Sequence, residues 1–246
     1  MNNSTNIYPI LKIKDLKKSF GENHVLNGFS MELYDGESLV IMGKSGSGKS
    51  VMIKCLVGLM EQDSGSIEIM NNDISELEQN DLDVLRTELG FLFQGSALYD
   101  SMTVRENLEF PLRKHEEKLE NKESLVLEAL ESVGLIDAID LMPVELSGGM
   151  KRRIALARAI IMNPKIIIYD EPTTGLDPIT AKEIIELMKN IQKKHGSASL
   201  IITHDIDCAR VIANRMILLI DGINYAEGTF KEIAASTDKN IQAFFK

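Results

Sequence analysis

The chain has 246 residues, of which 44% are hydrophobic and 26% charged, an ordinary balance for a soluble globular protein. The formal net charge of −10 argues against a nucleic-acid-binding surface, which usually needs a basic footprint. No run of about 18 apolar residues occurs and the N-terminus has no apolar segment, so we expect neither a membrane-spanning helix nor a signal peptide. Cys55 and Cys208 stand in no metal-binding spacing, which predicts buried, reduced side chains.

Strand patterns dominate the chain before residue 95. They include alternating faces, which suit half-buried strands, and one nearly continuous apolar segment that leads into a glycine-rich loop. A buried helix is expected directly after that loop, over residues 51–60. The expected strands are residues 10–16, 25–34, 37–43, 65–73 and 89–94.

The later part of the chain alternates strands with a helix. Three segments that are apolar on both faces predict strands of a parallel sheet, and a helical pattern at 180–196 separates the first two. These segments are residues 165–171, 199–205 and 215–222. Early antiparallel strands followed by a parallel set predict the α/β class.

The middle of the chain differs in composition, because it is charged and helical in period. We expect a mostly helical subdomain inserted into the α/β core, with residues 114–123 as a solvated helix end or loop. The chain is thus read as one domain of four parts. The α/β core and a β subdomain together occupy about 8–94 and 164–230. The helical subdomain occupies about 95–163, and a C-terminal tail occupies 231–246.

The strongest motif is a phosphate-binding loop. Gly43, Gly48, Lys49 and Ser50 match G-x-x-x-x-G-K-[ST] between a strand and a helix. The glycines let backbone N–H groups wrap phosphates, Lys49 offers charge to the β- and γ-phosphates, and the Ser50 hydroxyl can ligate Mg²⁺. The alternative, a plain glycine turn, explains neither the lysine nor the serine.

Polar residues end three further strands. Two carboxylates after a buried strand are costly without a role, so Asp170 is expected to hold Mg²⁺ and Glu171 to polarise the attacking water. His204 can donate a hydrogen bond to the γ-phosphate or position the water. Gln94 can reach Mg²⁺ or that water. Taken singly, the acidic pair could be a helix cap, His204 a structural histidine and Gln94 a polar turn residue.

A second anion-binding feature lies at LSGGM, residues 146–150. Ser147 and two glycines precede a helical run, and such a helix start exposes backbone N–H groups and the positive end of the helix dipole. Basic residues follow closely, and they form either a local basic patch or an ordinary solvated helix face. They are Lys151, Arg152, Arg153 and Arg158.

In order and spacing these motifs resemble the nucleotide-binding subunit of an ABC transporter, over about Leu11 to Gly228. GKSGSGKS is similar to the Walker A loop, IIIYDE to Walker B and LSGGM to the ABC signature. Gln94 resembles the Q-loop residue, TTGLD with Asp177 the D-loop, and His204 the switch histidine. Phe20 stands where the family has an aromatic residue, more usually tyrosine, that stacks on adenine.

The resemblance implies a P-loop NTPase fold: a RecA-like core, an antiparallel β subdomain and an inserted α-helical subdomain. It implies ATP and Mg²⁺ as cofactors, Glu171 and His204 as catalytic residues, and Ser50, Gln94 and Asp170 as metal-binding residues. It also implies a head-to-tail homodimer, in which each signature loop holds the γ-phosphate on the other chain. The implied ATP-binding residues are Phe20, Gly43, Lys44, Ser45, Gly46, Ser47, Gly48, Lys49, Ser50, Val51, Gln94, Ser147, Gly148, Gly149 and Asp177.

The signature ends in Met150, where most of the family has glutamine, and LSGGM resembles the ATPase of Mla-type, MCE-linked lipid transporters. That branch implies ATP hydrolysis that powers phospholipid transport at the cell envelope. The partners would be an integral membrane permease, which holds the dimer on the cytoplasmic face of the inner membrane, and an MCE-domain protein, with no nucleic acid. Two alternatives stay open: the ATPase of an importer for a small solute, and a soluble ABC ATPase that acts on ribosomes or DNA.

The segment after Gln94 carries several large apolar residues. Part of this set is expected to form an exposed apolar groove that binds the permease, and the alternative is that all of it is subdomain core. The set comprises Leu98, Tyr99, Met102, Leu108 and Phe110.

Overall fold

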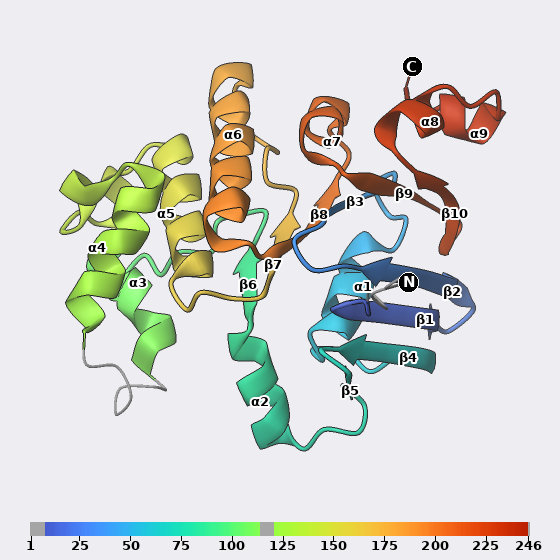
Figure 1. The fold of residues 1–246 in the computed structure, drawn as a ribbon, viewed down its shortest axis with the longest axis horizontal. Helices are drawn as coiled ribbons and strands as arrows, with labels where there is room; N and C mark the ends of the chain where they lie inside the picture. Colours follow the sequence, from blue (N-terminus) through green and yellow to red (C-terminus); the bar gives the residue numbers. More distant parts are fainter. Residues whose placement is uncertain (1–7, 114–120, 246) are drawn as a thin grey trace, which may run out of the picture.

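The computed structural model describes residues 8–113 and 121–245. The polar N-terminal residues, Lys246 and most of the charged stretch predicted at 114–123 therefore lie outside the described residues. Two β-sheets with helices packed around them make up the fold (Figure 1), and this confirms the predicted α/β class. In the described ranges, no helix combines the length and the apolar character needed to cross a membrane.

The smaller sheet is antiparallel and has the strand order β2-β1-β4-β5. Its long strands β1 and β2 are neighbours in sequence and in space, since a two-residue turn joins them. This agrees with the alternating patterns at 10–16 and 25–34. The strands are β1 (Leu11–Phe20), β2 (Asn23–Leu33), β4 (Ser64–Ile69) and β5 (Asn72–Asp73).

The larger sheet has the order β10-β9-β3-β8-β7-β6, and all its pairings are parallel except β10 with β9. Its central strands are buried on both faces, which explains their continuous apolar sequences. The strands are β3 (Ser38–Met42), β6 (Leu89–Leu92), β7 (Ile166–Asp170), β8 (Ala198–Thr203), β9 (Arg215–Ile220) and β10 (Ile223–Gly228).

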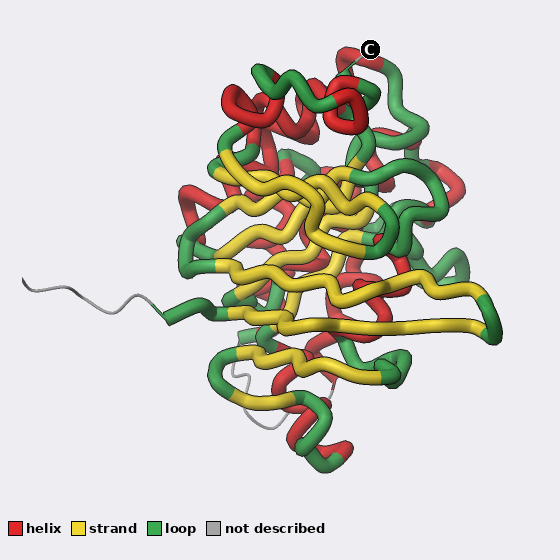
Figure 2. The backbone as a smooth tube through the Cα atoms, turned by 90° about the vertical axis from the view of Figure 1, so that its right-hand side faces the viewer, coloured by secondary structure: helices red, strands yellow, loops and turns green. Residues whose placement is uncertain are grey.

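Two hydrophobic cores fill the two faces of the larger sheet. Alternate residues of β3 divide between them: Leu39 and Ile41 pack with the smaller sheet and the helix after the glycine loop, whereas Val40 and Met42 pack with the other helices. Figure 2, a side view, shows the strands of both sheets lying close together. The parallel sheet is thus held rigidly from both sides, which fixes the positions of the loops at its ends.

Nine α-helices occur in the part of the chain that the structure describes. Side-chain caps define several of their starts: Asp177 accepts two backbone N–H groups at the start of α6, and Thr103 with Glu106 forms a capping box at α3. The helices are α1 (Lys49–Leu56), α2 (Gln79–Thr87), α3 (Val104–Glu109), α4 (Lys122–Val133), α5 (Gly148–Ile160), α6 (Pro178–His195), α7 (Ile206–Ile212), α8 (Phe230–Ala234) and α9 (Lys239–Gln242).

Helices α3, α4 and α5 pack against one another at one end of the molecule, on the left of Figure 1. They fall inside the region where the sequence predicts a helical subdomain, and the subdomain boundaries stay a prediction. Two short 3-10 helices, Ile136–Ala138 and Pro143–Glu145, connect α4 to α5. Cys55 and Cys208 are free and buried in the cores, as the sequence predicts.

The C-terminal segment folds back onto the domain. The Phe245 ring meets Phe230 edge to face at a centroid distance of 5.7 Å, and the Phe244 ring lies 5.9 Å from the Lys44 ammonium. Tyr225 donates a hydrogen bond to Asp238, which caps α9. The tail thus lies against the glycine-rich loop of its own chain.

Candidate functional site

The candidate site lies where the carboxyl ends of β3, β6, β7 and β8 meet. These strands are parallel, so the segments that follow them emerge at one edge of the sheet. The glycine-rich loop follows β3, Gln94 follows β6, Glu171 follows β7 and His204 follows β8. The fold therefore brings together four segments that lie far apart in the sequence.

The glycine-rich loop bends sharply into α1. Gly48 caps this helix at φ 102°, a left-handed conformation that favours glycine, and its missing side chain leaves room for the backbone of Val25. The Lys49 ammonium donates to the carbonyl oxygens of Gly43, at 2.6 Å, and Lys44, at 3.1 Å. The lysine thus lies across the inside of the loop, where phosphate oxygens can replace these carbonyls as its acceptors.

A cleft of about 630 Å³ opens beside this loop. Its lining joins the phosphate loop to the polar ends of the neighbouring strands. The lining residues are Val25, Lys44, Ser45, Gly46, Gly48, Lys49, Ser50, Val51, Gln94, Asp170, Glu171 and His204. Most of the residues that the sequence assigns to nucleotide, metal and catalysis therefore share one cavity.

Glu171 is buried and held by several donors. Its Oε2 lies 2.8 Å from Nδ1 of His204, 3.1 Å from the Thr174 hydroxyl and 3.4 Å from the Thr203 hydroxyl. The other oxygen, Oε1, lies 4.0 Å from the Lys49 ammonium. The backbone of Glu171 has φ 49°, which is uncommon for a residue with a side chain. His204 therefore contacts the carboxylate that is proposed as the base.

Burial and charge oppose each other in this cleft. Burial lowers the pKa of Lys49, while the Glu171 and Asp170 carboxylates act in the opposite direction. Burial also raises the pKa of Asp170, as does the charge of Glu171, and the Lys49 ammonium opposes them. Two carboxylates side by side with a single nearby ammonium make the cleft a favourable place for a further cation.

The donors in the cleft suit Mg²⁺. The Ser50 hydroxyl, the Gln94 amide and the Asp170 carboxylate all offer oxygen, the ligand atom that Mg²⁺ prefers. Among the described residues no group of three or more His, Cys, Asp or Glu side chains could hold a metal alone. This fits an ion held by few protein oxygens together with substrate phosphates.

Several predicted nucleotide contacts lie outside the cleft lining. Ser147 caps α5 by accepting the Met150 N–H at 3.2 Å, and an added side chain at Gly148 would meet nothing within 4 Å. Ser147 and Gly148 do not line the cleft of their own chain, and the space beside Gly148 is open, whereas Gly149 lies against Thr180. Other predicted residues outside the lining are Phe20, Gly43, Ser47, Gly149 and Asp177.

The predicted residues outside the cleft lining lie in different parts of the structure. Phe20 is 48% exposed at the end of β1, with the Lys18 ammonium 5.8 Å from its ring. Ser47 lines a neighbouring hollow on the other side of the loop, together with Phe244. Gly43 contributes its carbonyl to Lys49, and Asp177 serves as the cap of α6.

The sequence did not single out three residues that the structure places at the site. Val25 lines the cleft from β2, and Thr174 and Thr203 donate hydrogen bonds to Glu171. Thr174 belongs to the TTGLD motif and Thr203 directly precedes His204, so their positions next to motif residues could have pointed to both threonines. Nothing in the sequence distinguishes Val25 from the other apolar residues of its strand.

Comparisons with known proteins identify similar chains. The family model described as "ABC transporter" matches residues 26–174. The chain is 39% identical to the methionine import ATP-binding protein MetN of Brucella abortus, over 95% of this chain and 63% of that protein. It is 37% identical to the protein of the same name from Campylobacter jejuni, over 96% of this chain and 75% of that one. The chain thus spans less than two thirds of the Brucella relative.

A solved structure gives the same result for the fold. The ATP-binding cassette MJ0796, a dimer in a post-hydrolysis state bound to ADP and Pi, matches with a TM-score of 0.80 and 34% identity. The match covers 89% of this chain and 98% of that one. The predicted P-loop NTPase cassette is therefore confirmed. The predicted likeness to lipid transporters of the MCE-linked branch, with an MCE-domain partner, is not supported, since the named relatives are methionine importers.

Proposed function

Since the chain belongs to the ABC transporter family and carries its ATPase domain, which uses ATP with Mg²⁺, we propose that it is the motor subunit of an importer for a small solute. Two copies would bind ATP between them and drive a membrane permease. The identity with the methionine import proteins supports import as the direction and an amino acid as the class of solute. The protein would lie at the membrane through its permease.

One observation supports the proposed coupling of ATP hydrolysis to transport. The segment from Gln94 to Tyr99 starts at the ATP cleft and ends in an exposed apolar groove of about 510 Å³. We call this hollow the Tyr99 groove, and it lies between β6, α2, α3 and α5. Its aromatic and charged lining includes Phe91, Phe93, Tyr99, Phe110, Arg86 and Arg158. A partner bound in the groove would contact the same loop that carries Gln94.

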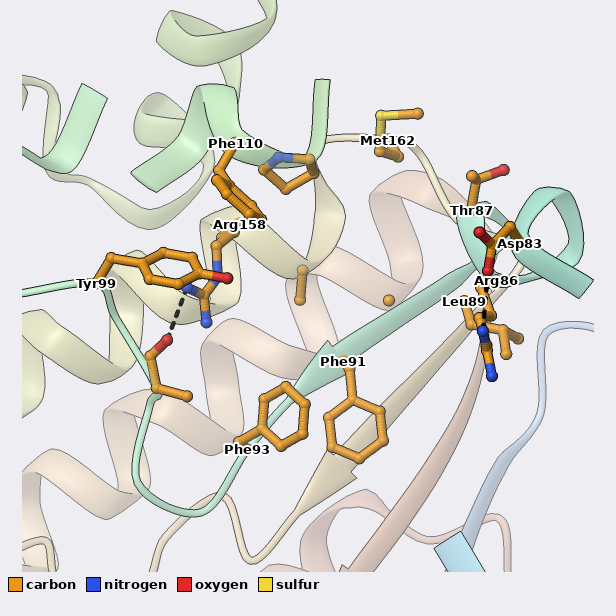
Figure 3. A pocket seen from close by; sticks show the side chains of 14 residues that line it. Asp83, Arg86, Thr87, Leu89, Phe91, Phe93, Tyr99, Phe110, Arg158 and Met162 are labelled. Atoms are coloured by element: carbon orange, nitrogen blue, oxygen red, sulfur yellow. Dashed lines mark hydrogen bonds and ion pairs between the residues drawn. The ribbon is translucent and has the colours of Figure 1, made fainter. Parts of the chain in front are cut away.

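Figure 3 shows the lining of the Tyr99 groove. The Tyr99 and Phe110 rings lie at one side with centroids 4.6 Å apart, and Phe91 and Phe93 form a second pair at 4.1 Å. Tyr99 is 41% exposed and Phe110 38%, whereas Leu108 is fully buried. The apolar set predicted after Gln94 therefore divides between surface and core. Aromatic anchors in a hollow are typical of a protein-binding surface.

Arg158 fixes the loop at the groove. Its guanidinium donates to the carbonyl oxygens of Ala97 and Ser96, at 2.8 and 3.0 Å, and lies 5.9 Å from the centre of the Tyr99 ring. Ser96 and Ala97 both have positive φ, at 62° and 47°, so this stretch of loop is held in an uncommon conformation. Arg158 thus holds the backbone of this loop at the edge of the groove.

The Tyr99 groove yields a direct prediction. Tyr99→Asp should leave the melting temperature close to that of the wild type and weaken association with the permease by about 30-fold or more, because aromatic anchors of this kind contribute on the order of 2 kcal/mol. The measurement is co-purification of the permease from detergent-solubilised membranes. Tyr8→Asp, an exposed tyrosine outside the groove, is the matched control. Full co-purification with Tyr99→Asp would exclude this surface.

Transport in vesicles tests the proposed function itself. The complex that co-purifies with this chain is placed in liposomes with ATP, and the movement of labelled methionine and of labelled phospholipid is followed. We expect ATP-dependent movement of the amino acid, which is lost when the complex carries Glu171→Gln. Movement of phospholipid without movement of the amino acid would contradict the importer and favour the lipid transporter that LSGGM suggested.

A further inference from the structure

The basic residues after LSGGM do not all lie on a solvated helix face. Arg152 is only 4% exposed, and Arg158 lies over the Tyr99 ring. Among the residues that the structure describes, Arg153 is the one of the three arginines that forms an ion pair, with Glu183 of α6. The expectation of a patch or a solvated surface is therefore wrong for Arg152, because this side chain turns from α5 into the domain.

Arg152 is buried without a counter-ion. Within residues 8–113 and 121–245 it forms no ion pair, its Nε has no hydrogen-bond partner, and burial lowers its pKa. A buried charge without an opposite charge is costly to the fold. An uncharged residue at this position would cost less folding free energy, so the arginine is expected to serve a purpose other than stability.

Two backbone carbonyl oxygens accept hydrogen bonds from the Arg152 guanidinium. One NH₂ group donates to Phe93 at 2.8 Å and the other to Thr174 at 3.2 Å. Phe93 directly precedes Gln94, and Thr174 lies three residues after Glu171. One side chain on the helix that starts at the signature thus holds two of the loops that reach the ATP cleft.

Thr174 in turn contacts Glu171, the proposed base. The Thr174 hydroxyl donates to Glu171 Oε2 at 3.1 Å, the same oxygen that His204 approaches at 2.8 Å. Arg152 therefore reaches Glu171 through a single residue. A shift of about 1 Å in a catalytic group can cost on the order of 100-fold in rate, so small changes in this chain of contacts matter.

We infer that Arg152 is a positioning residue for ATP hydrolysis, which fixes Thr174, and through its hydroxyl Glu171, relative to the Gln94 loop. This role rests on the proposed function of Glu171 as the base. The planar fork of arginine spans two carbonyl oxygens in different loops, which the single ammonium of a lysine cannot do in the same way. The signature helix is thereby joined by hydrogen bonds to both the Gln94 loop and the Glu171 loop.

Arg152→Lys tests this role, because it keeps the charge and removes the fork. We expect kcat for ATP to fall by about 2- to 30-fold, the range found for residues that couple sites, with KM for ATP little changed. Thr174→Val, which removes only the hydroxyl, should lower kcat to a similar extent. Arg105→Lys is the matched control, since Arg105 pairs with Glu123 and Asp140 away from the cleft.

The double variant distinguishes positioning from general stability. If Arg152 acts through Thr174, then Arg152→Lys with Thr174→Val should have a kcat no lower than the lower of the two single variants. Losses that multiply, a wild-type kcat for either single variant, or a change confined to KM would overturn the inference. Thr174→Val removes no buried charge and gives a result even where Arg152→Lys does not fold.

The experiment distinguishes failure of the role inferred for Arg152 from failure of the role proposed for Glu171. Glu171→Gln is measured in the same assay, and its loss of turnover together with wild-type kcat for Arg152→Lys refutes only the role of Arg152. An active Glu171→Gln variant refutes the role of Glu171 as the base, and with it the route from Arg152 to catalysis.

Discussion

Glu171→Gln is expected to lose turnover by about 10²- to 10⁴-fold, the contribution typical of a general base, while it still binds ATP. The glutamine keeps the shape of the side chain and can accept the hydrogen bonds of Thr174 and Thr203 through its oxygen. It cannot accept the proton of the attacking water. ATP binding is expected to persist, because Lys49 can keep its hydrogen bonds with the loop carbonyls of Gly43 and Lys44.

Lys49→Ala is the contrasting variant, because it removes the ammonium that lies inside the phosphate loop. We expect this change to weaken ATP binding itself. Phosphate release measures turnover, and titration with a fluorescent ATP analogue measures binding. Wild-type turnover of Glu171→Gln would show that another group takes the proton. Loss of ATP binding in that variant would show that Glu171 holds the nucleotide and is not the base.

Much of the fold could be predicted from the sequence, because the strands are short, apolar and separated by clear breaks. β3, β7 and β8 are buried on both faces, so their sequences are continuous in apolar residues and end abruptly in glycine, acid or histidine. The same abrupt ends located the cleft, because parallel strands deliver their carboxyl ends to one edge. β10 was missed because its alternating sequence INYAEG, which pairs antiparallel with β9, has no apolar run.

The side chains of α5 show what the sequence could not supply. Lys151, Arg152 and Arg153 are consecutive basic residues, and composition alone does not tell which one turns inward. Their directions depend on where α5 packs against the loops at Phe93 and Thr174, which are distant in sequence. His204 is similar: its place at a strand end was predictable, whereas its contact with Glu171 depends on how β7 and β8 pair.

We propose that the signature loop completes the ATP site of a partner chain. Ser147 and the N–H groups at the start of α5 can bind a phosphate, yet Ser147, Gly148 and Gly149 do not line the cleft of their own chain. Gly148 leaves open space in front of this helix start, which a γ-phosphate on another chain can enter. We therefore expect Ser147→Arg to block, by its bulk, closure of the composite site that contains it, and to spare ATP binding to the isolated chain.

Mixed dimers test this arrangement most directly. Chains with Lys49→Ala and chains with Ser147→Arg carry different tags, and heterodimers are isolated by two affinity steps. In a head-to-tail dimer one composite site receives both lesions and the other receives none. The matched control pairs a wild-type chain with a chain that carries both substitutions, which gives each composite site one lesion. The same two substitutions are present in both heterodimers, so only their distribution differs.

The deciding measurement is the rate of ATP hydrolysis by these two heterodimers. We expect the heterodimer of single variants to recover hydrolysis through its one intact site, and the control heterodimer to stay near background. Each single-variant homodimer should also stay near background. The opposite result, in which the heterodimer of single variants is inactive and the control is active, would show that each signature loop serves the ATP of its own chain.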